Sequence, residues 1–310
     1  MAHVKRILDS DTEHAHHRLR ARIAGFGESP FTPPKSCHVI LNGQRFHYLD
    51  WGNPKGDPVI FLHGGAQTAR TWDAVCHAAC ADETRRAVAL DQRGHGDSEW
   101  SYSFDYGPEA HAGDILALAD HIGIDRFSLV GMSMGCINGL RFALDYPSRV
   151  RSFVAVDAGP WLNAEGAQSI ADFVGGSNEL ASVSDYVERA LAFNPRKHPE
   201  LLEHSLRHNL RELPNGRWTW KTDWRRPGEF LEGVKQAVVS LQHEVHRLRC
   251  PLLVVRGGES DIFRDEHAQR FASAVQSGQW CMIPDAGHGV QGDQPRALVA
   301  KLIEFWNALD

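Results

Sequence analysis

Short apolar runs recur along the chain from about residue 37 onward. The run PVIFLHGG is apolar at consecutive rather than alternate positions, which is typical of a strand buried on both faces of a sheet. Later runs, each ending in Gly, Asp or His, have the same character: AVALDQRGHG, FSLVGMSMG, SFVAVDAG, PLLVVRGG and QWCMIPDAGH. Before them, VILNG and RFHYLDWG predict two strands joined by a tight turn at Asn42 and Gly43.

Segments with helical spacing of apolar residues separate these runs. One of them stops at Gly123, and glycine is typical of a helix C-terminus. Another follows Pro295, which favours the first turn of a helix, and continues toward the C-terminus. Strands that alternate with helices in this way predict an α/β fold whose mostly parallel sheet is covered by helices on both faces.

One long interval interrupts the alternation. Between residues 161 and 245 no strand-like apolar run occurs, but helical stretches such as VSDYVERALAF and ELLEHSLRHNL precede the aromatic-rich GRWTWKTDWRRP. Because an unstructured loop of this length is uncommon in a compact domain, the interval predicts an inserted, mostly helical cap. The predicted organisation is an N-terminal arm over residues 1–36, an α/β core over 37–160 and 246–310, and a cap over 161–245.

Composition and charge narrow the possible partners. The chain has 33 Lys and Arg against 39 Asp and Glu, a formal net charge of −6, and no basic block, so nothing favours nucleic-acid binding. No apolar run approaches the roughly 20 residues that span a bilayer, and the N-terminal residues lack the apolar segment of a secretory signal. The six cysteines are scattered and the histidines dispersed. We therefore predict a cytoplasmic protein with reduced thiols, no membrane association and no metal site.

The strongest chemical signal is the motif Gly131-Met132-Ser133-Met134-Gly135. The apolar FSLVG before it predicts a buried strand, and CINGLRFALDYP after it predicts a helix. A sharp turn between the two would hold the serine in a strained backbone conformation, with its hydroxyl exposed at the positive end of the helix. Glycines on either side avoid clashes with neighbouring elements. The pattern predicts Ser133 as a nucleophile.

A serine hydroxyl needs a base to take its proton, and the base needs a carboxylate to hold its tautomer. His288 lies between two glycines just after the last predicted strand, and we predict that it is the base. Asp261, in VVRGGESDIF, follows the preceding strand, and the order Ser133, Asp261, His288 is the one expected on such a fold. Asp261 is therefore the predicted carboxylate, with Asp157 and Glu259 as alternatives.

The oxyanion that forms when the serine attacks an acyl group needs two backbone N–H donors. One is predicted at Met134, directly after the nucleophile and at a helix N-terminus. The other is expected in the loop after PVIFLHGG, since glycine lets the backbone approach a ligand closely. We predict Gly65, with Ala66 as the alternative, and expect His63 to brace the loop.

With these pieces in order, residues 37–310 resemble the α/β-hydrolase superfamily throughout. The matching segments are HGG, DQRGHGDS, GMSMG, the GGESD loop and DAGHGV. The resemblance implies an eight-stranded, mostly parallel sheet flanked by helices, with a helical cap between the sixth and seventh strands and a site at the C-terminal edge of the sheet, under the cap. It also implies that DQRGHGDS braces the loop beside the site, so that Asp91, Arg93 and His95 are structural.

The resemblance also narrows the chemistry. Haloalkane dehalogenases and epoxide hydrolases of this fold carry Asp at the elbow, where this chain has Ser133. Carbon–carbon bond hydrolases typically have Asn just before the nucleophile, and this chain has Met132, whereas perhydrolases share the GxSMG elbow. Cys136 stands where many relatives have a third glycine, and either tightens helix–strand packing or sets a thiol near the nucleophile.

The interpretation is a serine hydrolase that cleaves a carboxylic ester, or a related acyl bond, of a small molecule through an acyl-enzyme, without metal or organic cofactor. The alternatives with the same residues are a lactonase, a thioesterase and a carbon–carbon bond hydrolase; the alternative from another class is a non-catalytic ligand receptor. Five aromatic residues of the cap are expected either to line the substrate pocket or to pack the cap's own core: Trp161, Phe193, Trp218, Trp220 and Trp224.

Overall fold

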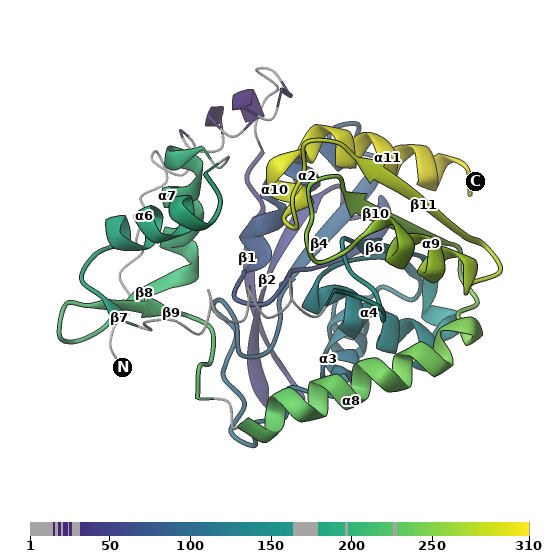
Figure 1. Ribbon diagram of the computed structural model, residues 1–310, viewed down its shortest axis with the longest axis horizontal. Coiled ribbons are helices and arrows are strands. Elements are labelled where there is room, and N and C mark those ends of the chain that lie inside the picture. The colour runs from purple at the N-terminus through teal and green to yellow at the C-terminus, as the bar shows by residue number, and fades with distance from the viewer. Residues whose placement is uncertain are drawn as a thin grey trace.

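An eight-stranded sheet, in the order β1-β2-β4-β3-β5-β6-β10-β11, forms the centre of the computed structural model (Figure 1). The structure describes residues 32–163, 179–195, 198–225 and 228–309, with several residues between 15 and 26. In this sheet β2 pairs antiparallel with β1 and β4, and the other neighbours pair in parallel. The strands span Lys35–Leu41 (β1), Gln44–Gly52 (β2), Asp57–Leu62 (β3), Arg85–Asp91 (β4), Phe127–Met132 (β5), Val150–Val156 (β6), Leu252–Gly257 (β10) and Gly278–Ile283 (β11). The predicted fold class is confirmed.

Helices cover both faces of this sheet (Figure 1). One face packs against α2 (Asp73–Ala79), α10 (Val290–Asp293) and α11 (Pro295–Asn307). The other packs against α3 (Pro108–His121), α4 (Met134–Asp145) and α9 (Asp265–Ser273). Short 3₁₀ turns complete the core at Ala69–Trp72 (η1), Pro147–Arg149 (η2) and Val245–Arg247 (η3).

Burial on both faces explains the consecutive apolar residues of the strands. Along β3, Val59 and Phe61 belong to the hydrophobic cluster that includes α2 and α11. Ile60 and Leu62, which point the other way, belong to the cluster that includes α3 and α4. All four side chains are at most 3% exposed, which explains why the four positions are all apolar.

The turn between β1 and β2 has the predicted form. Asn42 and Gly43 have φ angles of 50° and 77°, as in the two-residue turns that match the twist of a hairpin. The strands pair from Leu41 with Gln44 to Lys35 with Asp50. Most of the predicted N-terminal arm, residues 1–36, lies outside the described residues, and β1 begins at Lys35.

The segment between β6 and β10, the sixth and seventh strands of the main sheet, holds a second group of elements. It contains α6 (Val183–Phe193) and α7 (Pro199–Asn209), which lie apart from the main sheet in Figure 1. A separate sheet in the order β7-β9-β8 accompanies them, with strands Glu179–Leu180 (β7), Leu210–Glu212 (β8) and Trp218–Trp220 (β9). The sequence predicts a mostly helical segment and indicates none of these three strands. Strands of two or three residues are too short to produce a recognisable periodic pattern.

Two different hydrophobic cores share the residues of this segment. Val183, Tyr186, Leu206, Leu210 and Trp220 form a buried cluster of their own. The last helix of the segment, α8 (Gly228–Glu244), runs beside α4 of the main domain instead (Figure 1).

The second half of α8 packs on the α/β core. Leu241 and the following Val245 are buried in the same cluster as α3 and α4. Glu244 also forms an ion pair with Arg141 of α4, with 3.1 Å between Nη1 and Oε1. The apolar side chains near residue 245 therefore belong to the core of the main domain, and the predicted boundary at that residue does not separate two cores.

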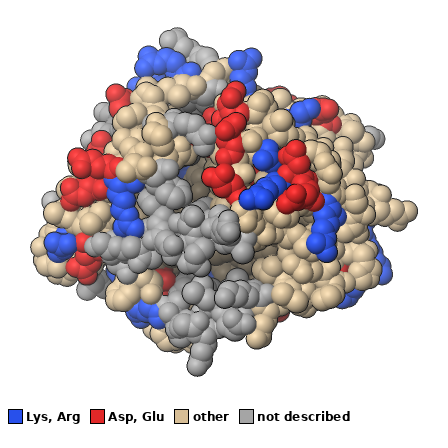
Figure 2. All heavy atoms as spheres, viewed as in Figure 1, with Lys and Arg blue, Asp and Glu red and all other residues tan. Residues whose placement is uncertain are grey.

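Acidic and basic side chains are interspersed on the face of the molecule seen in Figure 2. Within the described residues, no helix is both long enough and apolar enough to cross a lipid bilayer.

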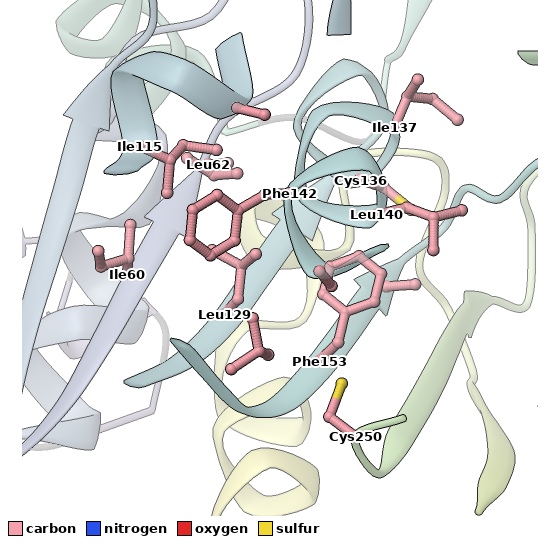
Figure 3. Packing of buried hydrophobic residues seen from close by; sticks show 14 of the residues in the cluster. Ile60, Leu62, Ile115, Leu129, Cys136, Ile137, Leu140, Phe142, Phe153 and Cys250 are labelled. Carbon is pink, nitrogen blue, oxygen red and sulfur yellow. The ribbon is translucent and has the colours of Figure 1, made fainter. Parts of the chain in front are cut away.

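Helix α4 is packed tightly onto the sheet at its glycine-containing face (Figure 3). Phe153 of β6 is fully buried, and a Cβ added at Gly139 of α4 would lie 2.9 Å from its ring. Gly139 has no side chain that could fill the space if the Phe153 ring were removed, and the tightly packed neighbours have little freedom to move into it.

We expect Phe153→Ala to lower the free energy of unfolding by about 3–5 kcal/mol, because it loses buried area and leaves a cavity. Urea denaturation followed by tryptophan fluorescence measures this change. The control is Ile40→Ala, since Ile40 is 68% exposed and its truncation should cost less than about 0.5 kcal/mol. Equal effects of the two substitutions would contradict the packing described for α4 and β6.

Candidate active site

Ser133 lies at a sharp reversal of the backbone between β5 and α4. Its φ and ψ angles are 52° and −118°, a region that a non-glycine residue enters only under strain, at a cost of about 1–3 kcal/mol. A Cβ at Gly131 would overlap the Gly135 carbonyl, and a Cβ at Gly135 would overlap the carbonyl of Leu62. Both glycines of the motif are therefore required by close packing, as the sequence indicated, and the side chain of Ser133 remains partly exposed.

The loop after β3 lies directly beside this serine. A Cβ built at Gly64 would lie 3.3 Å from the Cβ of Ser133 and 2.6 Å from the sulfur of Met132. At Gly65, by contrast, an added Cβ would meet no atom within 4 Å. The loop thus closes on the serine at one residue and borders open space at the next.

The backbone N–H groups around this space differ in whether they already donate a hydrogen bond within the protein. The Gly64 N–H already donates to Oε1 of Gln67, at 3.1 Å, and is not available to a ligand. The amide of Met134 is the first of α4, and the first N–H groups of a helix have no partner within it. Gly65 and Met134, the two predicted oxyanion donors, therefore lie in the two segments that approach each other at Ser133.

His288 is hydrogen-bonded to Asp157. Its Nδ1 lies 2.9 Å from Oδ2 of Asp157, whose side chain is fully buried at the end of β6, while the histidine is 17% exposed. Because a carboxylate accepts, the proton of the imidazole is assigned to Nδ1 and leaves Nε2 as an acceptor. That tautomer is the one a general base requires.

Other groups hold the Asp157 carboxylate in place. Its Oδ1 accepts the Gly257 N–H at 2.7 Å, and its Oδ2 accepts the Ser260 hydroxyl at 2.5 Å. The backbone connects the same carboxylate to the serine, because the Ser133 N–H donates to the carbonyl of Val156, 3.4 Å away. Asp157 is therefore bonded to His288 through its side chain, and the residue before it, Val156, is bonded to the backbone of Ser133.

The prediction that Asp261 orients His288 is wrong. The loop after β10 directs the hydroxyl of Ser260 inward to Asp157, and the next residue, Asp261, is exposed to solvent. The backbone carbonyl of Asp261 accepts a hydrogen bond from Asn163. Glu259 is not the carboxylate on His288 either, since Asp157 occupies that position.

Asp157 is visible in the sequence as an Asp directly after a predicted buried strand, and it is one of the two alternatives, with Glu259. Strands β6 and β10 are parallel neighbours, so the residues that follow both strands lie at the same edge of the sheet. Their sequence positions are therefore equivalent as candidates. The choice between them depends on which side chain turns inward.

The segment DQRGHGDS braces the loop after β3, as the resemblance implied. His63 is fully buried, and burial lowers its pKa, which favours the neutral ring. Its Nδ1–H is assigned as donor to the Gly64 carbonyl at 2.8 Å, while Nε2 accepts the Gln92 N–H at 3.0 Å. Arg93 forms a two-point ion pair with Asp114 of α3, at 2.6 and 2.8 Å.

The side chain of Cys136 packs between α4 and the sheet. It is fully buried in the cluster that includes Leu129 and Phe153 (Figure 3). Its sulfur lies 3.4 Å from the carbonyl of Ala158, and burial raises the pKa of the thiol. The first of the two predicted roles, helix–strand packing, therefore agrees with the structure.

Three side chains could bring their donor atoms to one metal ion. The nitrogen and oxygen donors of His47, Asp91 and Asp97 all lie within 4.8 Å of one another. Each is already engaged, since His47 Nδ1 lies 2.7 Å from Asp91 Oδ2 and Lys221 Nζ lies 2.7 Å from Asp97 Oδ1. Asp91 also accepts the Ala69 N–H at 2.6 Å. These bonds explain the cluster as a brace between loops.

The aromatic residues of the insertion occupy different environments. Trp220 is 5% exposed and its ring meets Tyr186 edge-on, with centroids 5.0 Å apart, inside the insertion's own cluster. Trp218 packs against that cluster, and Trp161 lies under the guanidinium of Arg270. Trp224 is 54% exposed, whereas the side chain of Phe193 lies outside the described residues. Trp218 and Trp220 thus follow the packing alternative.

Asp91 titrates far from its ordinary range. Burial alone would raise its pKa, but the attraction of His47, its hydrogen bond with that ring and the Ala69 N–H outweigh burial and lower the pKa well below the usual value. The ionised form of Asp91 is therefore more stable in the folded than in the unfolded state. Its stabilisation is fully present above about pH 4 and is lost as the pH falls through the lowered pKa.

We expect Asp91→Asn to destabilise the protein by on the order of 2 kcal/mol at pH 7, and by progressively less below pH 4. Urea denaturation at pH 7, 4 and 3 measures the difference from the wild type. Asp261→Asn is the control, because this exposed carboxyl group should change stability by less than about 0.5 kcal/mol at each pH. A constant difference for Asp91→Asn across the series would contradict the lowered pKa.

Comparisons with known proteins agree with the fold. A family model described as the alpha/beta hydrolase fold matches residues 57–295. The esterase Rv0045c of Mycobacterium tuberculosis is 32% identical over 259 residues, covering 81% of this chain and 83% of that protein. A crystal structure of this esterase has a TM-score of 0.78 at 29% identity and covers 97% of this chain and 99% of its own.

A more distant relative is a 3-hydroxybutyrate-oligomer hydrolase of Cupriavidus necator, 25% identical over 256 residues, which covers 79% of this chain and 87% of that protein. The family match spans most of the chain and includes Ser133, Asp157 and His288. The strained serine elbow, the sheet order and these matches together show that the chain belongs to the α/β-hydrolase superfamily.

Proposed function

We propose that this protein is a serine esterase that hydrolyses a carboxylic ester of a small molecule through an acyl-enzyme on Ser133. The observation that carries the proposal is the 2.9 Å hydrogen bond between His288 Nδ1 and the fully buried Asp157. A buried carboxylate bonded to Nδ1 of a histidine holds the imidazole in the tautomer of a general base and stabilises the imidazolium that forms during catalysis. The esterase relative at 32% identity supports the same substrate class.

In the first half of the reaction, Oγ of Ser133 attacks the ester carbonyl carbon while Nε2 of His288 takes the hydroxyl proton. The resulting oxyanion accepts hydrogen bonds from the backbone N–H groups of Gly65 and Met134. Asp157 stabilises the imidazolium that has formed. The tetrahedral intermediate then collapses, the C–O bond to the alcohol breaks, and His288 returns its proton to the leaving alkoxide.

In the second half, water replaces the alcohol. His288 takes a proton from the water as its oxygen attacks the acyl carbon, and the same two N–H groups hold the second oxyanion. Collapse of this intermediate breaks the bond to Ser133 Oγ, which recovers its proton from His288. The acid leaves and the resting enzyme is restored.

We propose that residues 161–245, the segment between β6 and β10, form a cap over the site. The cap is the part of the chain expected to select the substrate. A hydrogen bond of 3.1 Å from Thr68 to Asn209 supports its position beside the loop that carries Gly65. In this proposal the reacting groups come from the α/β core, and the cap selects the acyl or alcohol group.

We expect Ser133→Ala to abolish hydrolysis of a short nitrophenyl ester, because no other group supplies the nucleophile. The absorbance of the released nitrophenol measures turnover, and circular dichroism checks that the fold is retained. A fluorophosphonate probe should label the wild type and leave Ser133→Ala unlabelled. Retained turnover, or a wild type that the probe does not label, would reject the acyl-enzyme and favour a non-catalytic ligand receptor.

The two aspartates give opposite expectations. Asp157→Asn should lower kcat by about 10³–10⁴-fold, because the amide no longer holds the imidazole in the required tautomer. Asp261→Asn, at an exposed position beside the same site, should keep wild-type kcat within about twofold. The same ester assay compares the two variants, and a large loss in Asp261→Asn with a small one in Asp157→Asn would contradict the role of Asp157.

Parallel assays with lactones, thioesters and vinylogous diketones distinguish the remaining acyl substrates. The proposal predicts that kcat/KM is highest for an ester.

A further inference from the structure

One side chain of the insertion reaches the loop that carries the proposed oxyanion donor. Asn209 is the last residue of α7, and its Oδ1 accepts a hydrogen bond from the Thr68 hydroxyl at 3.1 Å. Its Nδ2 donates to the backbone carbonyl of Ala66 at 3.5 Å. The two contacted residues lie on either side of Gln67 and within three residues of Gly65.

The contacted loop is held in an unfavourable backbone conformation. The Gln67 N–H donates to the Gly64 carbonyl at 3.2 Å and closes a four-residue turn. Ala66, at the third position of this turn, has a φ of 59°, a conformation that an alanine adopts only with strain. Residues held in this way persist because surrounding contacts determine them. Asn209 supplies such a contact at the strained residue itself.

The other contact that holds the turn comes from α10, which follows the loop that carries His288. The side chain of Gln67 accepts the Gly64 N–H and lies 3.4 Å from Nε2 of Gln291, three residues after His288. Gln291 also donates to the hydroxyl of Thr71 at 3.0 Å. The α/β core thus holds the start of the turn, and Asn209 holds its strained third residue from the side of the insertion.

The position of Asn209 depends on the packing of the insertion. Leu206 and Leu210, on either side of it along the chain, are buried in the insertion's hydrophobic cluster. The backbone carbonyl of Asn209 accepts the Lys221 N–H at 2.8 Å, and the ammonium group of Lys221 pairs with Asp97 of the core. The amide of Asn209 is therefore placed by the insertion and by its attachment to the core together.

We propose that Asn209 is a positioning residue that couples the packing of the cap on the α/β core to the oxyanion hole. When the cap is packed on the core, Asn209 holds the strained Ala66, and the turn then presents the Gly65 N–H toward the acyl oxygen. This inference rests on the proposed function. It adds that the cap takes part in the chemical step, through the loop, as well as in substrate selection.

A purely structural fastening would have a different kinetic signature. If Asn209 only attached the cap, its loss would weaken substrate binding or stability and would raise KM. If it positions the Gly65 N–H, its loss weakens a contact that strengthens in the transition state, so kcat falls with little change in KM. The pH profile of kcat/KM should stay unchanged, because neither His288 nor Asp157 is touched.

The test uses the full chain with substitutions on both sides of the contact. Asn209→Ala removes both hydrogen bonds, and we expect kcat for a nitrophenyl ester to fall about 10- to 100-fold, since small misplacements of a catalytic group have effects of this size. Asn209→Asp keeps an oxygen for Thr68 but has no N–H for the Ala66 carbonyl, and should be at least as slow. Thr68→Val removes the other partner from the core side and should lower kcat less.

A matched control removes the same side chain elsewhere in the cap. Asn215 is exposed, and its side chain accepts a local hydrogen bond from the Arg217 N–H. We therefore expect Asn215→Ala to keep wild-type kcat and KM. Thermal melting of every variant checks the fold. If Asn209→Ala does not fold, Asn209→Asp and Thr68→Val still decide between the kcat and KM effects.

Relief of the backbone strain provides a second readout. Glycine adopts a φ near 59° without the penalty that alanine has. Ala66→Gly added to Asn209→Ala should therefore restore part of the lost kcat, a recovery that cap attachment alone would not produce.

Wild-type kcat in Asn209→Ala, a loss confined to KM, or no recovery with Ala66→Gly would overturn the inference. A wild type without esterase turnover or fluorophosphonate labelling would instead refute the proposed function, so the two failures are distinguishable.

Discussion

The close approach of α4 to the end of β3 is the constraint on which the site depends. The backbone reverses at Ser133 so sharply that Gly131 and Gly135 leave no space for a Cβ. The same packing brings the loop after β3 against the serine, because its Gly64 backbone lies beside the Ser133 side chain. The strained conformation of Ser133, the proposed nucleophile, and the two segments proposed to supply the backbone donors therefore arise from one packing arrangement.

The carboxylate of Asp157 joins the other half of the site. It connects the end of β6 to the loop after β10, through Gly257 and Ser260, and to the loop after β11, through His288. A fully buried carboxylate is costly unless hydrogen bonds compensate for its lost hydration, and these three donors do so. The arrangement that stabilises the charge also fixes the imidazole, so the same hydrogen bonds serve stability and the proposed catalytic geometry.

The insertion contributes through a few polar contacts placed by its own apolar core. Leu206, Leu210 and Trp220 determine where α7 ends, and α7 ends at the residue that contacts the strained turn. The second half of α8 belongs to the main core instead. The segment between β6 and β10 is thus divided between two hydrophobic cores, its own and that of the main sheet.

The sequence by itself determined the features that a few neighbouring residues encode. Consecutive apolar positions identified the buried strands, and the glycines around Ser133 identified the elbow, because both follow from local backbone geometry. The tertiary structure alone decided that Asp157, 131 residues from His288, turns inward while Asp261 faces solvent. It also decided that Asn209 meets Ala66, 143 residues away. Such pairings depend on how distant loops pack together, and no local pattern records which of two equivalent side chains will be buried.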